Sequence, residues 1–304
     1  MPEPKRVIIQ GHRGARGVLP ENTLAGFIHA FDVGADVVEI DINASADDAL
    51  IVVHDETTNP DLVRGADGAW VESRIPYRSL ALAEIRRLDV GRIRPGSRYA
   101  ERFPGQQPMD GSRIPVFAEL AELVLARAGA GINVEIKCDP AEQDDADEPR
   151  RLAGLVVGEI DRLGLRRRVS VQSFNWSVVA AVRELDPKLV TGCLSSEQPD
   201  FDTIGRNGSR PSRFTHSLRP ADFGGSLPAM VKAMGVDYWA SDHRDLDKTR
   251  IAEAHELGLE VYAWTVNDPG DMRRLISLGA DSIITDYPAV LVDVAGADRS
   301  NNKP

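Results

Sequence analysis

The feature that most constrains the fold of this 304-residue chain is a series of short Val- and Ile-rich runs separated by amphipathic stretches. Short apolar runs bounded by turn signals are typical of buried strands. Several of the amphipathic stretches end in Gly, the usual residue just past a helix. Thr23 or Asn22 is a suitable N-cap for the first helix. We expect eight strands that alternate with helices, at residues 7–12, 37–42, 132–137, 169–174, 189–194, 238–241, 261–266 and 282–285.

This alternation and the chain length predict an α/β fold, specifically a (β/α)8 TIM barrel. A doubly wound open sheet has the same alternation and is the alternative. Polar residues follow many different strands, which favours the barrel. All strand carboxyl ends of a barrel meet at one mouth, whereas an open sheet builds its site at one switch point.

The stretch between the second and third predicted barrel strands is much longer than one crossover. It contains the Gly-, Pro- and Arg-rich segment GRIRPGSRYAERFPGQQPMDGSRIP. Long irregular segments in compact domains are usually functional or mobile. We therefore expect residues 55–115 to form an insertion over the barrel mouth, within one barrel domain of residues 1–294. Residues 295–304 are expected to form a flexible tail.

The formal net charge of −11 argues against general nucleic-acid binding and requires local cations for any anionic substrate. The two cysteines have neither zinc-site spacing nor the pattern of a disulfide framework. No signal-peptide h-region or membrane span is apparent. The sequence as it stands indicates a cytoplasmic protein, and a periplasmic or exported one if a leader was removed. It does not specify the oligomeric state.

Three carboxylates lie in apolar strand runs, namely Glu39 and Asp41 in VVEID and Glu135 in INVEIK. Residues two apart on a strand project from the same face, so Glu39 and Asp41 repel unless a cation lies between them. An oxygen-rich site suits Mg²⁺ or Ca²⁺ better than zinc. We predict one divalent cation at these carboxylates. The alternative is salt bridging to Arg13 and Lys137.

Two histidines, His12 in VIIQGHRG and His54 in LIVVHD, also follow apolar runs. Histidine titrates near neutrality, so one ring could accept a proton while the other donates one. Arg13 and Lys137 are candidate phosphate ligands, since Arg offers a planar fork and Lys a point charge.

Further polar and aromatic residues end other strands. Gln172 is a candidate hydrogen-bonding group and Trp264 a candidate pocket wall, with simple packing as the alternative for both. Asp242 and Asp286 are expected to have local capping roles.

Taken together, the motifs resemble the glycerophosphodiester phosphodiesterase family in its bacterial form. They are GHRGARGVLPENT, VVEIDI, LIVVHD, NVEIK, VQSF, AWTVN and GADSIITDYP, which occur in the family's order from His12 to Pro288. The resemblance implies a TIM barrel of metal-dependent phosphodiesterases, with an insertion that helps to shape specificity. It implies metal binding by the three carboxylates, acid–base roles for the two histidines, phosphate contacts for Arg13 and Lys137, and a place near the site for Asn22.

The function expected from this resemblance is hydrolysis of a glycerophosphodiester to sn-glycerol 3-phosphate and an alcohol. Two alternatives are a phospholipase-D-like hydrolase of lysophospholipids and a non-catalytic phosphate-binding barrel. The sequence leaves open the alcohol, the choice between Mg²⁺ and Ca²⁺, and which histidine is the base. It also leaves open whether water attacks directly or a cyclic phosphate forms first.

Overall fold

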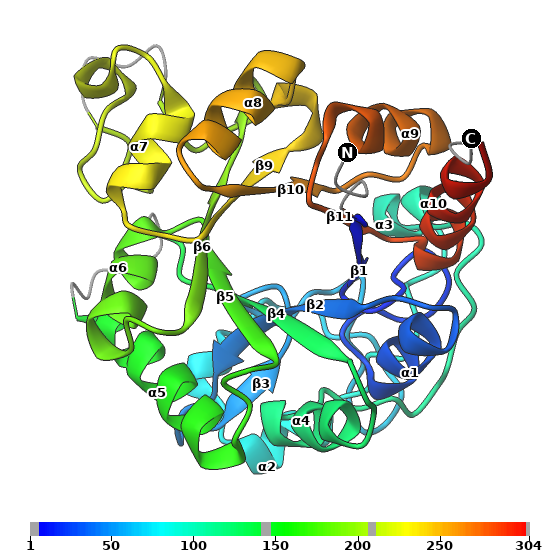
Figure 1. The fold of residues 1–304 in the computed structure, drawn as a ribbon. Coiled ribbons are helices and arrows are strands. Elements are labelled where there is room, and N and C mark those ends of the chain that lie inside the picture. Colours follow the sequence, from blue (N-terminus) through cyan, green and yellow to red (C-terminus); the bar gives the residue numbers. More distant parts are fainter. Residues whose placement is uncertain (1–5, 141–146, 206–210, 302–304) are drawn as a thin grey trace.

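A computed structural model describes residues 6–140, 147–205 and 211–301. Eight parallel strands form a closed barrel surrounded by helices (Figure 1). The pairing of β1 with both β11 and β2 closes the sheet, which confirms the predicted barrel and rules out the open sheet. The barrel strands are β1 (Ile8–His12), β2 (Val37–Ala44), β4 (Gly131–Ile136), β5 (Val169–Ser173), β6 (Val190–Ser195), β9 (Tyr238–Asp242), β10 (Glu260–Trp264) and β11 (Ser282–Thr285).

The larger helices pack their apolar faces against the outside of the barrel and begin at side-chain caps in several cases. The Thr23 hydroxyl accepts a hydrogen bond from the Gly26 N–H group and so caps the first helix, as expected. Helix α5 ends at Gly164, whose φ of 69° suits a residue without a Cβ atom. These helices are α1 (Leu24–Asp32), α4 (Phe117–Leu125), α5 (Glu148–Leu163), α6 (Trp176–Leu185), α7 (Leu227–Ala233), α8 (Lys248–Glu256), α9 (Pro269–Leu278) and α10 (Pro288–Asn301).

Within the described ranges, no helix has the length and apolar character needed to cross a membrane. Helix α10 runs through the start of the predicted tail as far as Asn301, and residues 302–304 lie outside the described residues.

Strand register brings the predicted site residues together at the carboxyl ends of the strands. Along β2, buried apolar residues face the helices and alternate with Glu39 and Asp41, which face the barrel interior. The pairing of β2 with β4 sets Asp41 opposite Glu135. The pairing of β1 with β2 sets His12 opposite Glu39. Residues distant in the chain thus become direct neighbours.

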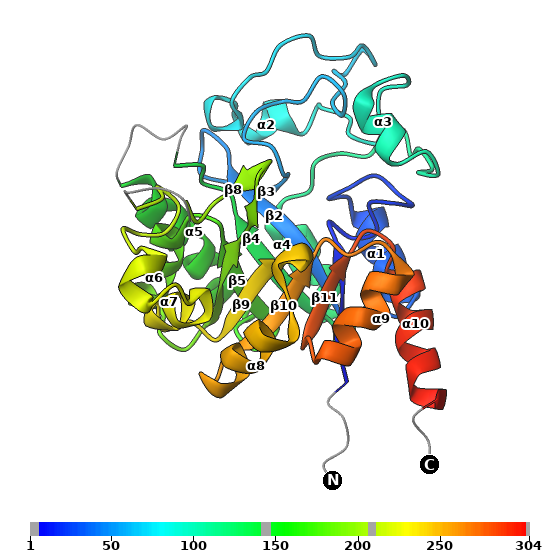
Figure 2. The same cartoon turned by 90° about the horizontal axis from the view of Figure 1, so that it is seen from above.

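The chain between β2 and α4 forms an insertion between the second and third barrel strands, as predicted, and it lies above the carboxyl ends of the strands (Figure 2). It includes β3 (Leu50–Val52), which precedes residue 55, the predicted start. It has a small apolar core of its own around Ile51, Tyr77, Ile85 and Ile114. Its first strand pairs antiparallel with β2. Its elements are β3 (Leu50–Val52), η1 (Tyr77–Ser79), α2 (Leu82–Ile85) and α3 (Arg98–Arg102). A second irregular region after β6 contains the hairpin of β7 (Glu197–Gln198) and β8 (Phe201–Asp202) and the turn η2 (Pro220–Phe223), while η3 (His243–Asp245) follows β9.

Gly192 in β6 provides a test of packing in the barrel interior. A Cβ atom at Gly192 would lie 2.1 Å from the ring of Tyr238. That ring cannot withdraw easily, because it stacks on Tyr262 at 4.1 Å and its hydroxyl donates to Asn133. We expect Gly192→Ala to lower the free energy of unfolding by about 1–3 kcal/mol in urea denaturation.

The matched control is Gly154→Ala in α5, where an added Cβ meets no atom within 4 Å. This control should be neutral or stabilise the protein by up to about 1 kcal/mol, because Ala has the higher helix propensity. Equal stability of Gly192→Ala and the wild type would contradict the packing argument.

Candidate active site

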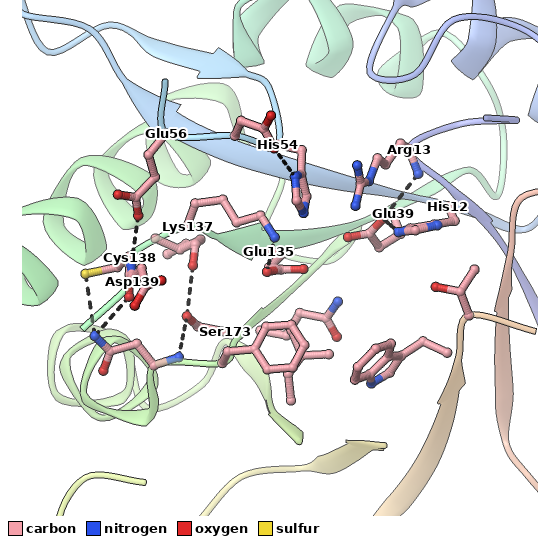
Figure 3. A pocket seen from close by; sticks show the side chains of 18 of the residues that line it. His12, Arg13, Glu39, His54, Glu56, Glu135, Lys137, Cys138, Asp139 and Ser173 are labelled. Carbon is pink, nitrogen blue, oxygen red and sulfur yellow. Dashed lines mark hydrogen bonds and ion pairs between the residues drawn. The ribbon is translucent and has the colours of Figure 1, made fainter. Parts of the chain in front are cut away.

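A cavity of about 620 Å³ opens at the carboxyl ends of the barrel strands. Its lining includes charged residues, here called the charged side, and aromatic residues, here called the aromatic side. The aromatic side consists of Phe174, Phe201, Phe214 and Trp264. In Figure 3 the side chains of the charged side converge on one space from β1, β2, β4 and the segment after β3. The charged side brings together six residues singled out from the sequence, namely His12, Arg13, Glu39, His54, Glu135 and Lys137.

Three buried carboxylates lie together at the charged side, where Glu39 and Glu135 line the cavity and Asp41 is outside its lining. Glu39, Asp41 and Glu135 each offer an oxygen, and these oxygens lie within 4.8 Å of one another. Burial, together with the neighbouring carboxylates of Asp41 and Glu135, raises the pKa of Glu39 well above its ordinary value. Asp41 Oδ1 accepts no hydrogen bond from the described residues, although Lys137 Nζ lies 3.1 Å away as an ion-pair partner. This set of oxygen donors fits a Mg²⁺- or Ca²⁺-type ion.

Two cations lie directly beside the carboxylates. Arg13 Nε is 3.2 Å from Asp41 Oδ2, and the Arg13 backbone N–H group donates to Glu39 Oε2 at 3.2 Å. Lys137 ion-pairs with both Asp41 and Glu135. The salt bridges considered as the alternative are therefore present. Because Arg13 and Lys137 also line the cavity, an anionic ligand can reach both of them.

His12 is oriented by a buried carboxylate behind it. Its Nδ1 atom lies 2.7 Å from Asp286 Oδ1, while its Nε2 atom lies 3.8 Å from Glu39 Oε2. Burial and the nearby Arg16 lower the pKa of His12 to about 4. A carboxylate only accepts hydrogen bonds, so the neutral ring donates from Nδ1 and keeps the Nε2 lone pair toward the carboxylate cluster.

The same contacts correct the expected capping role of Asp286. Its carboxylate accepts two hydrogen bonds from Arg16 and one from Asn267, besides the bond from His12. It therefore joins β1, β11 and the loop after β10. Asp242, by contrast, does cap the turn η3, as expected.

His54 is held in a similar way by its sequence neighbour. Its Nδ1 atom lies 2.7 Å from Asp55 Oδ1, and Asn59 donates to the other oxygen of Asp55 at 2.6 Å. Burial, followed by the charges of Arg13 and Lys137, lowers the pKa of His54. Both histidines thus have a carboxylate at Nδ1 and line the same cavity.

The remaining predicted residues occupy different positions. Gln172 and Trp264 line the cavity. Asn22 is outside its lining and lies behind the cluster, where it donates to Asp41 Oδ2 at 2.9 Å. Asn22 and Arg13 have φ values of 53° and 51°. Residues other than Gly rarely adopt this conformation, which marks the loop after β1 as a strained part of the site.

Sequence reasoning missed most of the aromatic side of the cavity. Phe174 packs edge-on against both Phe201 and Trp264, with ring centroids 5.1 and 5.2 Å apart. Phe174 directly follows β5, so its strand-end position was a usable signal. Phe201 and Phe214 come from the irregular region after β6, where no periodic pattern marks them.

A closed parallel barrel with this charged cavity at its carboxyl ends defines the class of TIM-barrel enzymes. The model of the glycerophosphoryl diester phosphodiesterase family matches residues 12–290, and the chain belongs to that family. It is therefore a phosphodiesterase of the glycerophosphodiester type.

Individual comparisons agree with this assignment. The glycerophosphodiester phosphodiesterase of Caldanaerobacter subterraneus is 27% identical, over 95% of this chain and 98% of the relative. A crystal structure from Silicibacter pomeroyi, of a protein assigned as a glycerophosphoryl diester phosphodiesterase, has a TM-score of 0.86 at 31% identity and covers 97% and 95% of the two chains. An Oleispira antarctica phosphodiesterase in complex with the product sn-glycerol-3-phosphate shares the fold, with a TM-score of 0.70, 20% identity and coverage of 96% and 97%.

Proposed function

We propose that this protein uses one divalent cation to hydrolyse glycerophosphodiesters to sn-glycerol 3-phosphate and an alcohol. One observation supports the proposal most directly. Two members of the buried carboxylate cluster, Glu39 and Glu135, border a single cavity together with two cations and two histidines that each have a carboxylate at Nδ1. The Oleispira antarctica complex supports the identity of the product.

The charged residues have separate tasks in this mechanism. Glu39, Asp41 and Glu135 would hold Mg²⁺ or Ca²⁺, which when bound neutralises charge on the phosphoryl oxygens. Arg13 and Lys137 would contact the phosphate. Their local positive charge is needed because the protein as a whole carries a net charge of −11.

The histidines would carry the protons. One accepts a proton from the attacking hydroxyl, and the other donates a proton to the leaving alkoxide. Two nucleophiles fit the arrangement: water, or the neighbouring glycerol hydroxyl, which would form a cyclic phosphate that water then opens. Detection of a transient cyclic phosphate in rapid-quench experiments distinguishes the two routes.

The aromatic side of the cavity favours a second candidate substrate class, the lysophospholipids. Phe201 is 44% exposed and extends the row of Phe174 and Trp264 outward from the barrel. An acyl chain could lie along such a row. The Arg-, Gly- and Pro-rich insertion favours smaller polar alcohols instead.

A substrate panel tests these proposals together. Purified protein is incubated with glycerophosphodiesters of choline, ethanolamine, glycerol and inositol, and with lysophosphatidylcholine, in Mg²⁺, Ca²⁺ or chelator. We expect release of sn-glycerol 3-phosphate from at least one glycerophosphodiester, and a loss of at least about a hundredfold in chelator. Full activity in chelator would refute the metal proposal. Faster turnover of lysophosphatidylcholine than of glycerophosphocholine would favour the second candidate, and binding without turnover would favour a non-catalytic barrel.

A further inference from the structure

Tyr99, in helix α3 of the insertion, lies against the loop that follows β1 and carries Arg13, Arg16 and Glu21. Its ring borders the cavity. Its hydroxyl donates a hydrogen bond to Glu21 Oε2 and accepts one from Arg16 Nη1 at 3.4 Å. Burial and the nearby Glu21 raise the pKa of Tyr99, so the hydroxyl keeps its proton and can donate.

The first of these contacts leads to Arg13. The other oxygen of Glu21 accepts a hydrogen bond from Arg13 Nη1 at 2.8 Å. The Glu21 side chain is 11% exposed and the Arg13 side chain 9% exposed, so water competes little for either group. Tyr99 and Arg13 therefore share one carboxylate, and Tyr99 limits the positions that the carboxylate and its guanidinium partner can take.

The second contact leads to His12. The Arg16 guanidinium donates two hydrogen bonds to Asp286, the carboxylate that orients His12. The insertion also covers this guanidinium, because the Arg16 Cζ atom lies 4.7 Å from the ring centroid of Phe103. Gln106 further donates to the Arg16 carbonyl at 2.7 Å. The insertion thus contacts Arg16 through three side chains.

We propose that Tyr99 is a positioning residue that aligns Arg13 through Glu21 and His12 through Arg16. The insertion is then part of the catalytic assembly as well as a cover over it. This inference rests on the proposed function for the roles of Arg13 and His12. It also predicts a distinct result. Because Arg13 and His12 both act at the phosphate, which every substrate shares, the loss of Tyr99 should affect all substrates equally.

The test is Tyr99→Phe, which removes one hydroxyl and keeps the ring. We expect kcat/KM to fall about tenfold, because a charge-assisted hydrogen bond is lost from the network. The fall should be the same, within about twofold, for glycerophosphodiesters with different alcohols. The affinity for sn-glycerol 3-phosphate, measured by calorimetry with saturating Mg²⁺, should weaken as well, while the melting temperature and Mg²⁺ affinity stay close to wild type.

Tyr77→Phe is the matched control. Tyr77 is a buried tyrosine of the same insertion, and its hydroxyl has no hydrogen-bond partner among the residues that the structure describes. This variant should keep wild-type kcat/KM. A double-mutant cycle of Tyr99→Phe with Arg13→Lys should give a combined loss smaller than the product of the single losses, because the residues are coupled through Glu21.

Three results would overturn the inference. One is an unchanged kcat/KM and sn-glycerol 3-phosphate affinity in Tyr99→Phe. Another is a loss that depends strongly on the alcohol, which would make Tyr99 a specificity residue. The third is a loss fully explained by a lower folded fraction. If the wild type releases no sn-glycerol 3-phosphate from any diester, the proposed function fails, and the calorimetric comparison still tests whether Tyr99 positions the anion site.

Discussion

Replacement of Asp41 by Asn is expected to leave a folded protein that binds divalent metal poorly and has lost at least about a thousandfold in kcat. Asp41 is completely buried and lies opposite Glu135 in the strand register, so no solvent-exposed group can replace its oxygen. Glu39→Gln and Glu135→Gln should show the same loss. Calorimetric titration with Mg²⁺ and Ca²⁺, together with steady-state kinetics, measures both effects.

Without metal, Asp41→Asn and Glu39→Gln should change the free energy of unfolding in different directions. Asp41 is paired with Arg13 and Lys137, so Asp41→Asn should lower the free energy of unfolding in chelator. Burial and the neighbouring carboxylates raise the pKa of Glu39, which means that a negative charge is unfavourable at this position. Glu39→Gln removes that charge and should therefore leave the free energy of unfolding unchanged or increase it. The control is Glu122→Gln, the same change at an exposed site on α4, which should behave as wild type. Full activity, in chelator, of a variant that carries Asp41→Asn, Glu39→Gln and Glu135→Gln together would exclude the proposed metal site.

The second large effect is a loss of kcat on replacement of either histidine. His12→Ala and His54→Ala are each expected to lower kcat by about 10²–10⁴-fold, because a proton transfer loses its positioned partner. Metal affinity should change only modestly, since neither imidazole belongs to the carboxylate cluster. The measurement is kcat at saturating metal, alongside the metal dissociation constant.

His255→Ala provides the control for the histidine variants. His255 lies on α8, is 41% exposed and hydrogen-bonds to Asp281 away from the cavity. Its replacement should leave kcat unchanged. Near-normal kcat in His12→Ala or His54→Ala would remove that histidine from the proposed acid–base pair.

Much of the barrel could be predicted from the sequence because strands and helices leave local periodic patterns. All eight barrel strands occur where the short apolar runs predicted them, with ends shifted by no more than two residues. The two-residue spacing of Glu39 and Asp41 was enough to place them on one face of a strand. The Thr23 cap is also local, because its partner is only three residues away.

The site was less predictable where it depends on irregular segments. Asp286 was expected to cap a local turn, yet it binds His12 and Arg16, which are some 270 residues away in the chain. Tyr99 and Phe201 reach the cavity from segments without a periodic pattern, so nothing in their neighbouring sequence indicated their contacts.

The sequence by itself determined which chemical groups end the strands, because that follows from residue type and from the alternation of strand faces. Only the tertiary structure decided which of these groups meet. Barrel closure sets His12 opposite Glu39, and the register of β2 and β4 sets Asp41 opposite Glu135. The docking of the insertion brings Tyr99 onto Glu21 and Arg16. Such contacts depend on how distant segments pack, and the local periodicity of a sequence does not predict that packing.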